Sequence, residues 1–101
     1  MTGRRVVWSE RALTEFENQV RYIVQHNETA VAKMGRLIRE AGHKLGQRPT
    51  GRPGVRPGTY EKVLPGLPYI LVYSLEAPDT VTILHVFHGA QDWKNLTGEL
   101  N

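Results

Sequence analysis

The sequence contains no cysteine. This absence excludes a disulfide-stabilised scaffold, zinc sites built on thiolates, iron–sulfur clusters and a cysteine nucleophile, and it fits a reducing cytosol. Long apolar runs are also missing. The longest clear one, Tyr69–Tyr73, is far shorter than the roughly 20 residues that cross a bilayer, and the first ten residues lack the apolar stretch of a signal peptide. We therefore expect a cytoplasmic protein without a membrane partner.

The chain has 101 residues, which leaves room for one domain over 1–101. Hydrophobic residues make up 40% and charged residues 23% of it. These proportions are those of a folded globular chain and are too apolar for a disordered one. We expect a short C-terminal tail at about 95–101.

Positive charge is concentrated in one part of the chain. Residues 33–62 hold eight Lys or Arg and two Glu, so this window carries +6 while the whole chain carries +3. Such a concentration favours an acidic partner, either a nucleic acid or an acidic protein segment. A solvated helix face followed by a basic loop would explain the same charges.

Two apolar stripes at a spacing of three and four predict two amphipathic helices. Ser9 can cap the first helix, and His26-Asn27 would end it. Gly46 is expected to stop the second helix, and Pro49 prevents it from restarting. The residues of the first stripe are Ala12, Leu13, Phe16, Val20, Ile23 and Val24, and those of the second are Ala30, Met34, Leu37, Ile38, Ala41 and Leu45. Both stripes are expected to lie in the core, in an antiparallel helical hairpin.

The remaining segments predict strands around a loop. Half of residues 46–59 are Gly or Pro and three are Arg, which predicts a long loop of the kind that usually carries function or disorder. β-like runs stand at 5–8, 60–64, 69–73 and 81–87. The continuously apolar run 69–73 should occupy the middle of the sheet. We expect an α+β fold in the order β-α-α-β-β-β, with a small, curved, mainly antiparallel sheet and the helical hairpin on one face.

Polar functional side chains are densest at the end of the last strand, at His85, His88, Gln91, Asp92 and Trp93. Because alternate residues of a strand point to opposite faces, the two histidines should diverge. We see no spacing that would bring further ligands to one metal ion. His88 has the chemistry of a general base; a partly buried histidine bonded to the following turn is the alternative.

Phosphate-cradling loops, dinucleotide fingerprints and nucleophile elbows are absent from the sequence. What remains is a basic loop beside a sheet face that could carry Tyr60, Lys62 and one histidine. Such a surface can bind phosphates, and with a base and several cations it can cleave RNA.

The chain resembles the ParE branch of the RelE/ParE toxin superfamily, the toxins of bacterial toxin–antitoxin pairs such as those that stabilise plasmids. The resemblance runs from Val6 to Trp93 and is carried by the joint order of several short motifs rather than by any one of them. These are Val7-Trp8-Ser9-Glu10-Arg11-Ala12, Tyr22-Ile23, Pro49-Thr50-Gly51-Arg52-Pro53-Gly54, Gly58-Thr59-Tyr60-Glu61, Pro68-Tyr69-Ile70-Leu71-Val72-Tyr73 and His88-Gly89-Ala90-Gln91-Asp92-Trp93. The family's fold is the β-α-α-β-β-β order derived above.

The resemblance implies one of two activities. RelE-like members are ribosome-dependent mRNA endonucleases; in that case His88, Tyr73, Lys62 and Arg56 would be the catalytic residues here. The position where those relatives carry an arginine on the middle strand is Ile70 in this chain, and Gln91 stands where arginine is frequent. Since RNA cleavage needs cations to stabilise the charge on phosphorus, we expect the ParE-like activity, which is inhibition of DNA gyrase by binding and without catalysis.

The resemblance also implies a ParD-like antitoxin whose acidic C-terminal segment would wrap the toxin. Its binding surface, or that of the target, is expected among Arg36, Arg39, Arg48, Arg52, Arg56, Tyr60, Lys62, His88, Gln91 and Trp93. The ribosome and its mRNA would be the target of a nuclease. An inactive toxin fold that binds only an antitoxin is a third possibility. No cofactor and no metal are expected in any of the three.

Overall fold

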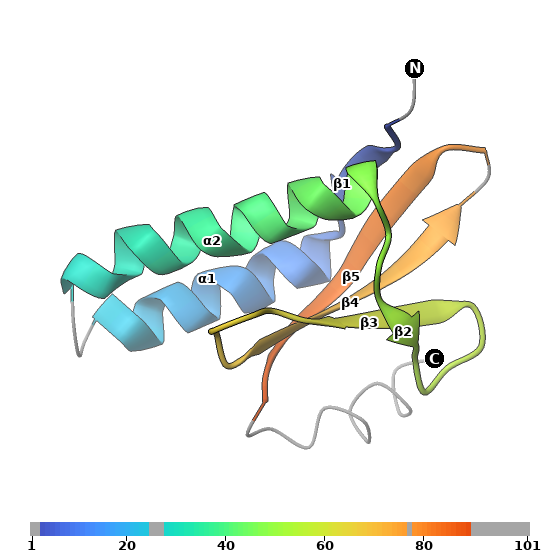
Figure 1. Cartoon of the computed structure of the whole chain (residues 1–101). Coiled ribbons are helices and arrows are strands. Elements are labelled where there is room, and N and C mark those ends of the chain that lie inside the picture. Colours follow the sequence, from blue (N-terminus) through green and yellow to red (C-terminus); the bar gives the residue numbers. More distant parts are fainter. Residues whose placement is uncertain (1–2, 25–27, 77, 90–101) are drawn as a thin grey trace.

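The fold is a five-stranded sheet with two helices on one face, as a computed structural model shows (Figure 1). The structure describes residues 3–24, 28–76 and 78–89. The elements are β1 (Arg5–Trp8), α1 (Glu10–Val24), α2 (Glu28–Gln47), β2 (Arg52–Pro53), β3 (Thr59–Val63), β4 (Tyr69–Glu76) and β5 (Thr80–His88). The strand order is β1-β5-β4-β3-β2, with β1 parallel to β5 and all other neighbours antiparallel. The predicted α+β class and order are confirmed, with the short β2 as an addition.

Ser9 joins the sheet to α1. Its Oγ accepts a hydrogen bond from the Ala12 N–H at 3.0 Å, as the predicted N-cap should. The same hydroxyl donates to the Leu84 carbonyl at 3.1 Å, and the Ser9 N–H donates to the Ile83 carbonyl at 2.9 Å. The start of α1 is therefore fixed to β5 directly where β1 ends.

The main core lies between the helices and the sheet. Its buried members are Ala12, Met34, Ile38, Leu45, Leu64, Tyr69, Leu71, Tyr73, Val81, Ile83 and Val86. The prediction that both apolar stripes belong to this core is confirmed for Ala12, Met34, Ile38 and Leu45. It is wrong for Leu13, which is 45% exposed because it follows the fully buried Ala12 by about 100° of helix turn.

β4 is the third of the five strands and is buried on both faces. Alternate residues Tyr69, Leu71 and Tyr73 belong to the main core, whereas Ile70 and Val72 form a second buried cluster with Phe87 on the face away from the helices. This confirms that the run 69–73 lies in the middle of the sheet. The two histidines of β5 diverge as predicted: His85 stacks on Phe87 at 4.8 Å, and His88 meets Tyr69 edge-on at 5.5 Å.

Gly46 does not stop α2, which ends one residue later at Gln47. A Cβ at Gly46 would lie 2.6 Å from Val6 Cγ2 and 2.7 Å from the Arg4 carbonyl oxygen, and the Gly46 carbonyl accepts the Arg4 N–H at 2.6 Å. Glycine therefore lets α2 touch the first strand. The helix ends because the residue before Pro49 is disfavoured in helical geometry.

The expected loop 46–59 is shorter and more ordered than predicted, because it begins after α2 and includes β2, which pairs with β3. The predicted turn at 65–68 is present; Gly66 has a φ of 73°, and the Leu67 N–H donates to the Leu64 carbonyl. The expected helix end at His26-Asn27 and the tail 95–101 lie outside the described residues. In the described part of the chain, neither helix has the length and apolarity needed to span a membrane.

Candidate functional site

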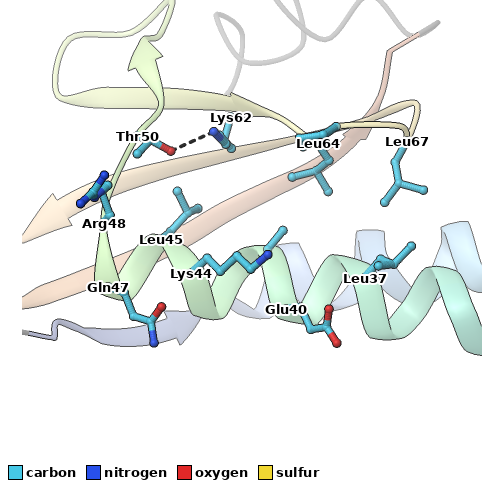
Figure 2. A pocket seen from close by; sticks show the side chains of 12 residues that line it. Leu37, Glu40, Lys44, Leu45, Gln47, Arg48, Thr50, Lys62, Leu64 and Leu67 are labelled. Carbon is cyan, nitrogen blue, oxygen red and sulfur yellow. Dashed lines mark hydrogen bonds between the residues drawn. The ribbon is translucent and has the colours of Figure 1, made fainter.

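A groove runs between α2 and the sheet (Figure 2). Its larger section has a volume of about 610 Å³ and lies between the second half of α2, β3 and the turn after β3. A second section of about 340 Å³ continues toward the start of α2 and shares Leu37 and Leu67 with the first. We call the whole the α2 groove. It spans Ala30 to Arg48 of the chain, or roughly 27 Å at 1.5 Å per helical residue.

The floor of the α2 groove is apolar and its rim is polar. The floor residues in the larger section are Leu37, Ala41, Leu45, Leu64 and Leu67, and the rim residues are Glu40, Lys44, Gln47, Arg48, Thr50, Lys62 and Pro65. The smaller section adds Ala30, Lys33, Met34, Gly66, Pro68 and Tyr69. An apolar trough of this kind can bury the apolar side of a helical segment.

Three cations line the larger section of the groove: Lys44 in the last turn of α2, Arg48 directly after α2, and Lys62 on β3. The Lys44 side chain extends along the helix toward Glu40 (Figure 2). Arg48 follows the last residue of α2, and its N–H donates to the Lys44 carbonyl at 2.8 Å. Lys62 pairs with the core residue Leu71 across the β3–β4 ladder, which directs its side chain toward the helices. Its Nζ donates a hydrogen bond to Thr50 Oγ1 at 2.8 Å. The carboxyl end of a helix also favours positive charge.

The segment after α2 is fastened to the sheet by Tyr73. The Gly51 N–H donates to the Tyr73 hydroxyl at 2.8 Å, and Tyr60 stacks on the Tyr73 ring at 5.6 Å. A Cβ at Gly51 would lie 2.6 Å from that hydroxyl oxygen and from the Glu61 carbonyl oxygen. Burial raises the pKa of Tyr73 above its usual value, the Gly51 hydrogen bond opposes this, and Tyr60 adds to it. This wall of the groove is thus held in close contact with β3 and β4.

Glu61 and Arg52 form an ion pair on the sheet face away from the helices. The Arg52 Nε lies 3.7 Å from Glu61 Oε1, with the Glu61 side chain 4% and the Arg52 side chain 63% exposed. The two residues are opposite each other in the β2–β3 ladder. This ion pair joins β2 to β3.

Glu15 closes the edge of β5 beyond the point where β1 stops. Its Oε1 accepts the Val86 N–H at 2.9 Å, and its Oε2 lies 3.3 Å from His85 Nδ1. No sequence signal pointed to Glu15, because the contact joins residues 71 positions apart.

The structure separates the binding residues expected from the sequence. Arg48 and Lys62 lie on the α2 groove. Arg39 lies on a different hollow, between α1 and α2, and Arg36 is exposed. Arg52 pairs with Glu61, Arg56 lies in the turn between β2 and β3, Tyr60 packs on Tyr73, and His88 lies against Tyr69. Gln91 and Trp93 lie outside the described residues.

Two residues of the hypothetical nuclease site, Tyr73 and His88, lie apart from each other. Tyr73 is 1% exposed, and Tyr69, which pairs with His88, stands four residues before Tyr73 on β4. At about 3.4 Å per residue, that is roughly 14 Å along the strand. Ile70, at the expected arginine position, is buried with Val72 and Phe87. Within 3–24, 28–76 and 78–89, no three His, Asp or Glu side chains are grouped so that they could hold a metal ion.

A protein-family model described as "ParE toxin of type II toxin-antitoxin system, parDE" matches residues 6–93. The chain belongs to the ParE toxin family. A curated relative from Sinorhizobium fredii, named "Putative toxin Y4kP", is 35% identical over 94 residues, which are 92% of this chain and 96% of the relative. The sequence motifs predicted this family. The chain is therefore a toxin of a type II toxin–antitoxin system.

Solved structures of two toxin–antitoxin systems resemble this ParE-family chain. One, titled as a chromosomal ParDE system from P. aeruginosa, superposes with a TM-score of 0.78 at 18% identity and covers 87% of this chain and 98% of that chain. The other, the RelBE2 toxin–antitoxin complex from Mycobacterium tuberculosis, has a TM-score of 0.61 at 23% identity and covers 90% and 97%. At these identities the likeness shows the shared fold.

The apolar pattern of the second helix contained information on the groove that the periodicity of its residues alone did not reveal. The apolar stripe of the second helix was assigned entirely to the core, yet it is wider than one packed face. Leu37 and Ala41 are only half-buried, and they line the same groove as Lys44 and Arg48. The i, i+4 spacing of Leu37 and Ala41 and the cation Lys44 one turn later would have indicated that this side of the second helix is a binding surface.

Proposed function

We propose that this chain is a cytoplasmic toxin that inhibits DNA gyrase by binding it, and that a ParD-like antitoxin neutralises it. The observation that carries the antitoxin half is the α2 groove. An acidic amphipathic helix would bury its apolar side over Leu37, Ala41 and Leu67 and direct its carboxylates toward Lys44, Arg48 and Lys62. The solved relatives named above come from toxin–antitoxin systems, which supports a partner of this kind.

The chemistry of the sheet supports binding rather than RNA cleavage. A nuclease must surround the reacting phosphate with cations. On the face away from the helices, the described part of the sheet instead buries Ile70, Val72 and Phe87 together with the carboxylate of Glu61. On the other face, Tyr73 is enclosed in the core and its hydroxyl is engaged with Gly51.

The test is a supercoiling assay with purified gyrase, ATP and relaxed plasmid, to which the purified chain is added. We expect inhibited supercoiling or trapped double-strand breaks, both relieved when the chain is first mixed with its antitoxin. A translation extract with a defined mRNA is run in parallel. Unaffected gyrase together with cleaved mRNA would contradict the proposal in favour of a ribosome-dependent nuclease. Activity in neither assay would contradict it in favour of an inactive toxin fold.

A further inference from the structure

The α2 groove is charged unevenly along its length. Lys44, Arg48 and Lys62 line the larger section of the groove; Arg48 follows the end of α2 directly, whereas the Lys44 side chain extends back along the helix toward Glu40 (Figure 2). Toward the start of α2, the rim carries the single cation Lys33, and Glu40 lies between the two ends. The larger section therefore carries +2 in sum, since Glu40 is among its lining residues, and the smaller section carries +1.

The apolar part of the lining fixes the length and pattern of what can fill the groove. A helix beside α2 would place side chains at i, i+3, i+4 and i+7 over the floor, because these share one face. About 27 Å of groove corresponds to roughly 18 helical residues. Leu37 and Leu67 lie where the two sections meet and Met34 lies in the smaller section, so the apolar contacts extend beyond Lys44, Arg48 and Lys62 toward the start of α2.

Lys62 offers its partner a better bond than the one that it makes now. In the free chain its ammonium donates to the neutral Thr50 hydroxyl. A carboxylate acceptor makes a bond roughly twice as strong as a neutral one. An acidic side chain entering the groove beside Thr50 would therefore take Lys62 from it, while the same side chain placed beside Glu40 would meet a like charge.

We propose that the α2 groove selects its partner by where charge is placed along the segment, rather than by total charge. It takes an amphipathic helical segment whose carboxylates cluster at one end, and that end lies against Lys44, Arg48 and Lys62. Glu40 acts against segments that are acidic along their whole length. The inference rests on the proposed function, because the segment would belong to the antitoxin.

The test uses designed 18-residue helical peptides of identical composition, each with leucines on one face. Three glutamates stand together at the N-terminal end, together at the C-terminal end, or spread evenly. Each peptide carries a photo-crosslinker beside a glutamate, and affinity is measured by fluorescence anisotropy. We expect the clustered peptides to bind about tenfold more tightly than the spread one, since each exposed pair contributes a few-fold. Crosslinks from either clustered peptide should fall on residues 48–52.

Two variants of the full chain complete the design. Lys44→Glu with Lys62→Glu should abolish the preference for clustered glutamates, whereas Arg36→Glu with Arg39→Glu, on the same helix but off the groove, should keep it. Equal affinity for all three peptides, or crosslinks from the glutamate end on residues 65–68, would overturn the inference. The gyrase assay uses no peptide, so a charge preference without gyrase inhibition would remove the proposed target and leave the groove's selectivity in place.

Discussion

Single side chains explain how the loop wall of the groove keeps its position. The hydroxyl of Tyr73, on the central strand, accepts a hydrogen bond from the Gly51 N–H. Arg52, which follows Gly51, forms an ion pair with the buried Glu61. From the sequence, Tyr73 was a candidate catalytic residue of a nuclease and Arg52 a candidate binding residue. Their contacts link residues 22 and 9 positions apart in the chain, and local patterns carry no information on such pairs.

Tyr73→Phe should make the protein less sensitive to alkaline pH. Burial raises the pKa of Tyr73 above the ordinary value of 10.0, so the unfolded chain ionises first as the pH rises. The free energy of unfolding should thus be level below about pH 10 and fall as the pH climbs through the raised pKa. Tyr69, with a pKa raised by burial and by Tyr22, adds to the same loss in both proteins.

Urea denaturation of both proteins between pH 8 and pH 11 measures this. At pH 8 the variant should be less stable by about 1 kcal/mol, the typical contribution of one hydrogen bond. The difference should shrink above pH 10. A constant difference across the whole range would show that the Tyr73 hydroxyl does not titrate differently in the folded protein.

At the scale of elements, periodicity predicted most of the fold. The spacing of apolar residues indicated both helices, and β-branched and aromatic runs indicated four of the five strands. β2 was not predicted, because a strand of two residues, one of them Pro53, has no periodic pattern. The strand is defined only by its pairing with β3. Gly46 was misinterpreted as a stop because its role, contact with Val6 and Arg4, depends on packing between distant segments.

Gly46→Ala should destabilise the protein, whereas Gly35→Ala on the same helix should not. A methyl group at Gly46 would meet Val6 and the Arg4 backbone at under 3 Å, and such overpacking costs about 1–3 kcal/mol. A Cβ at Gly35 would have its nearest neighbouring atoms at 3.7 Å. Alanine there should therefore raise the free energy of unfolding by about 0.5–1 kcal/mol, through its higher helix propensity.

Thermal unfolding of the two variants checks the pair. The midpoint should fall for Gly46→Ala and stay level or rise for Gly35→Ala. Equal unfolding midpoints for the two alanine variants would show that the close approach of α2 to the first strand does not contribute to the free energy of unfolding.

At the scale of the whole molecule, the fold sorts charges that the sequence groups together. The sequence indicates one basic patch over residues 33–62. In the structure, however, Lys44 lies on the α2 groove and Arg39 lies on the hollow between α1 and α2. Lys62 joins Lys44 and Arg48 only because β3 lies across the groove from α2. The net charge of the window predicted an acidic partner, whereas the proposed binding face could be found only from the three-dimensional arrangement.

The groove as the antitoxin site is the central claim, and calorimetric titration of the cognate antitoxin into charge-reversed variants tests it most directly. Lys44→Glu with Lys62→Glu should weaken binding at least tenfold, because both changes replace attraction by repulsion along the groove. Arg36→Glu with Arg39→Glu changes the net charge equally and should leave the affinity within about threefold. Equal losses in the two double variants, or a greater loss in the second, would contradict the assignment.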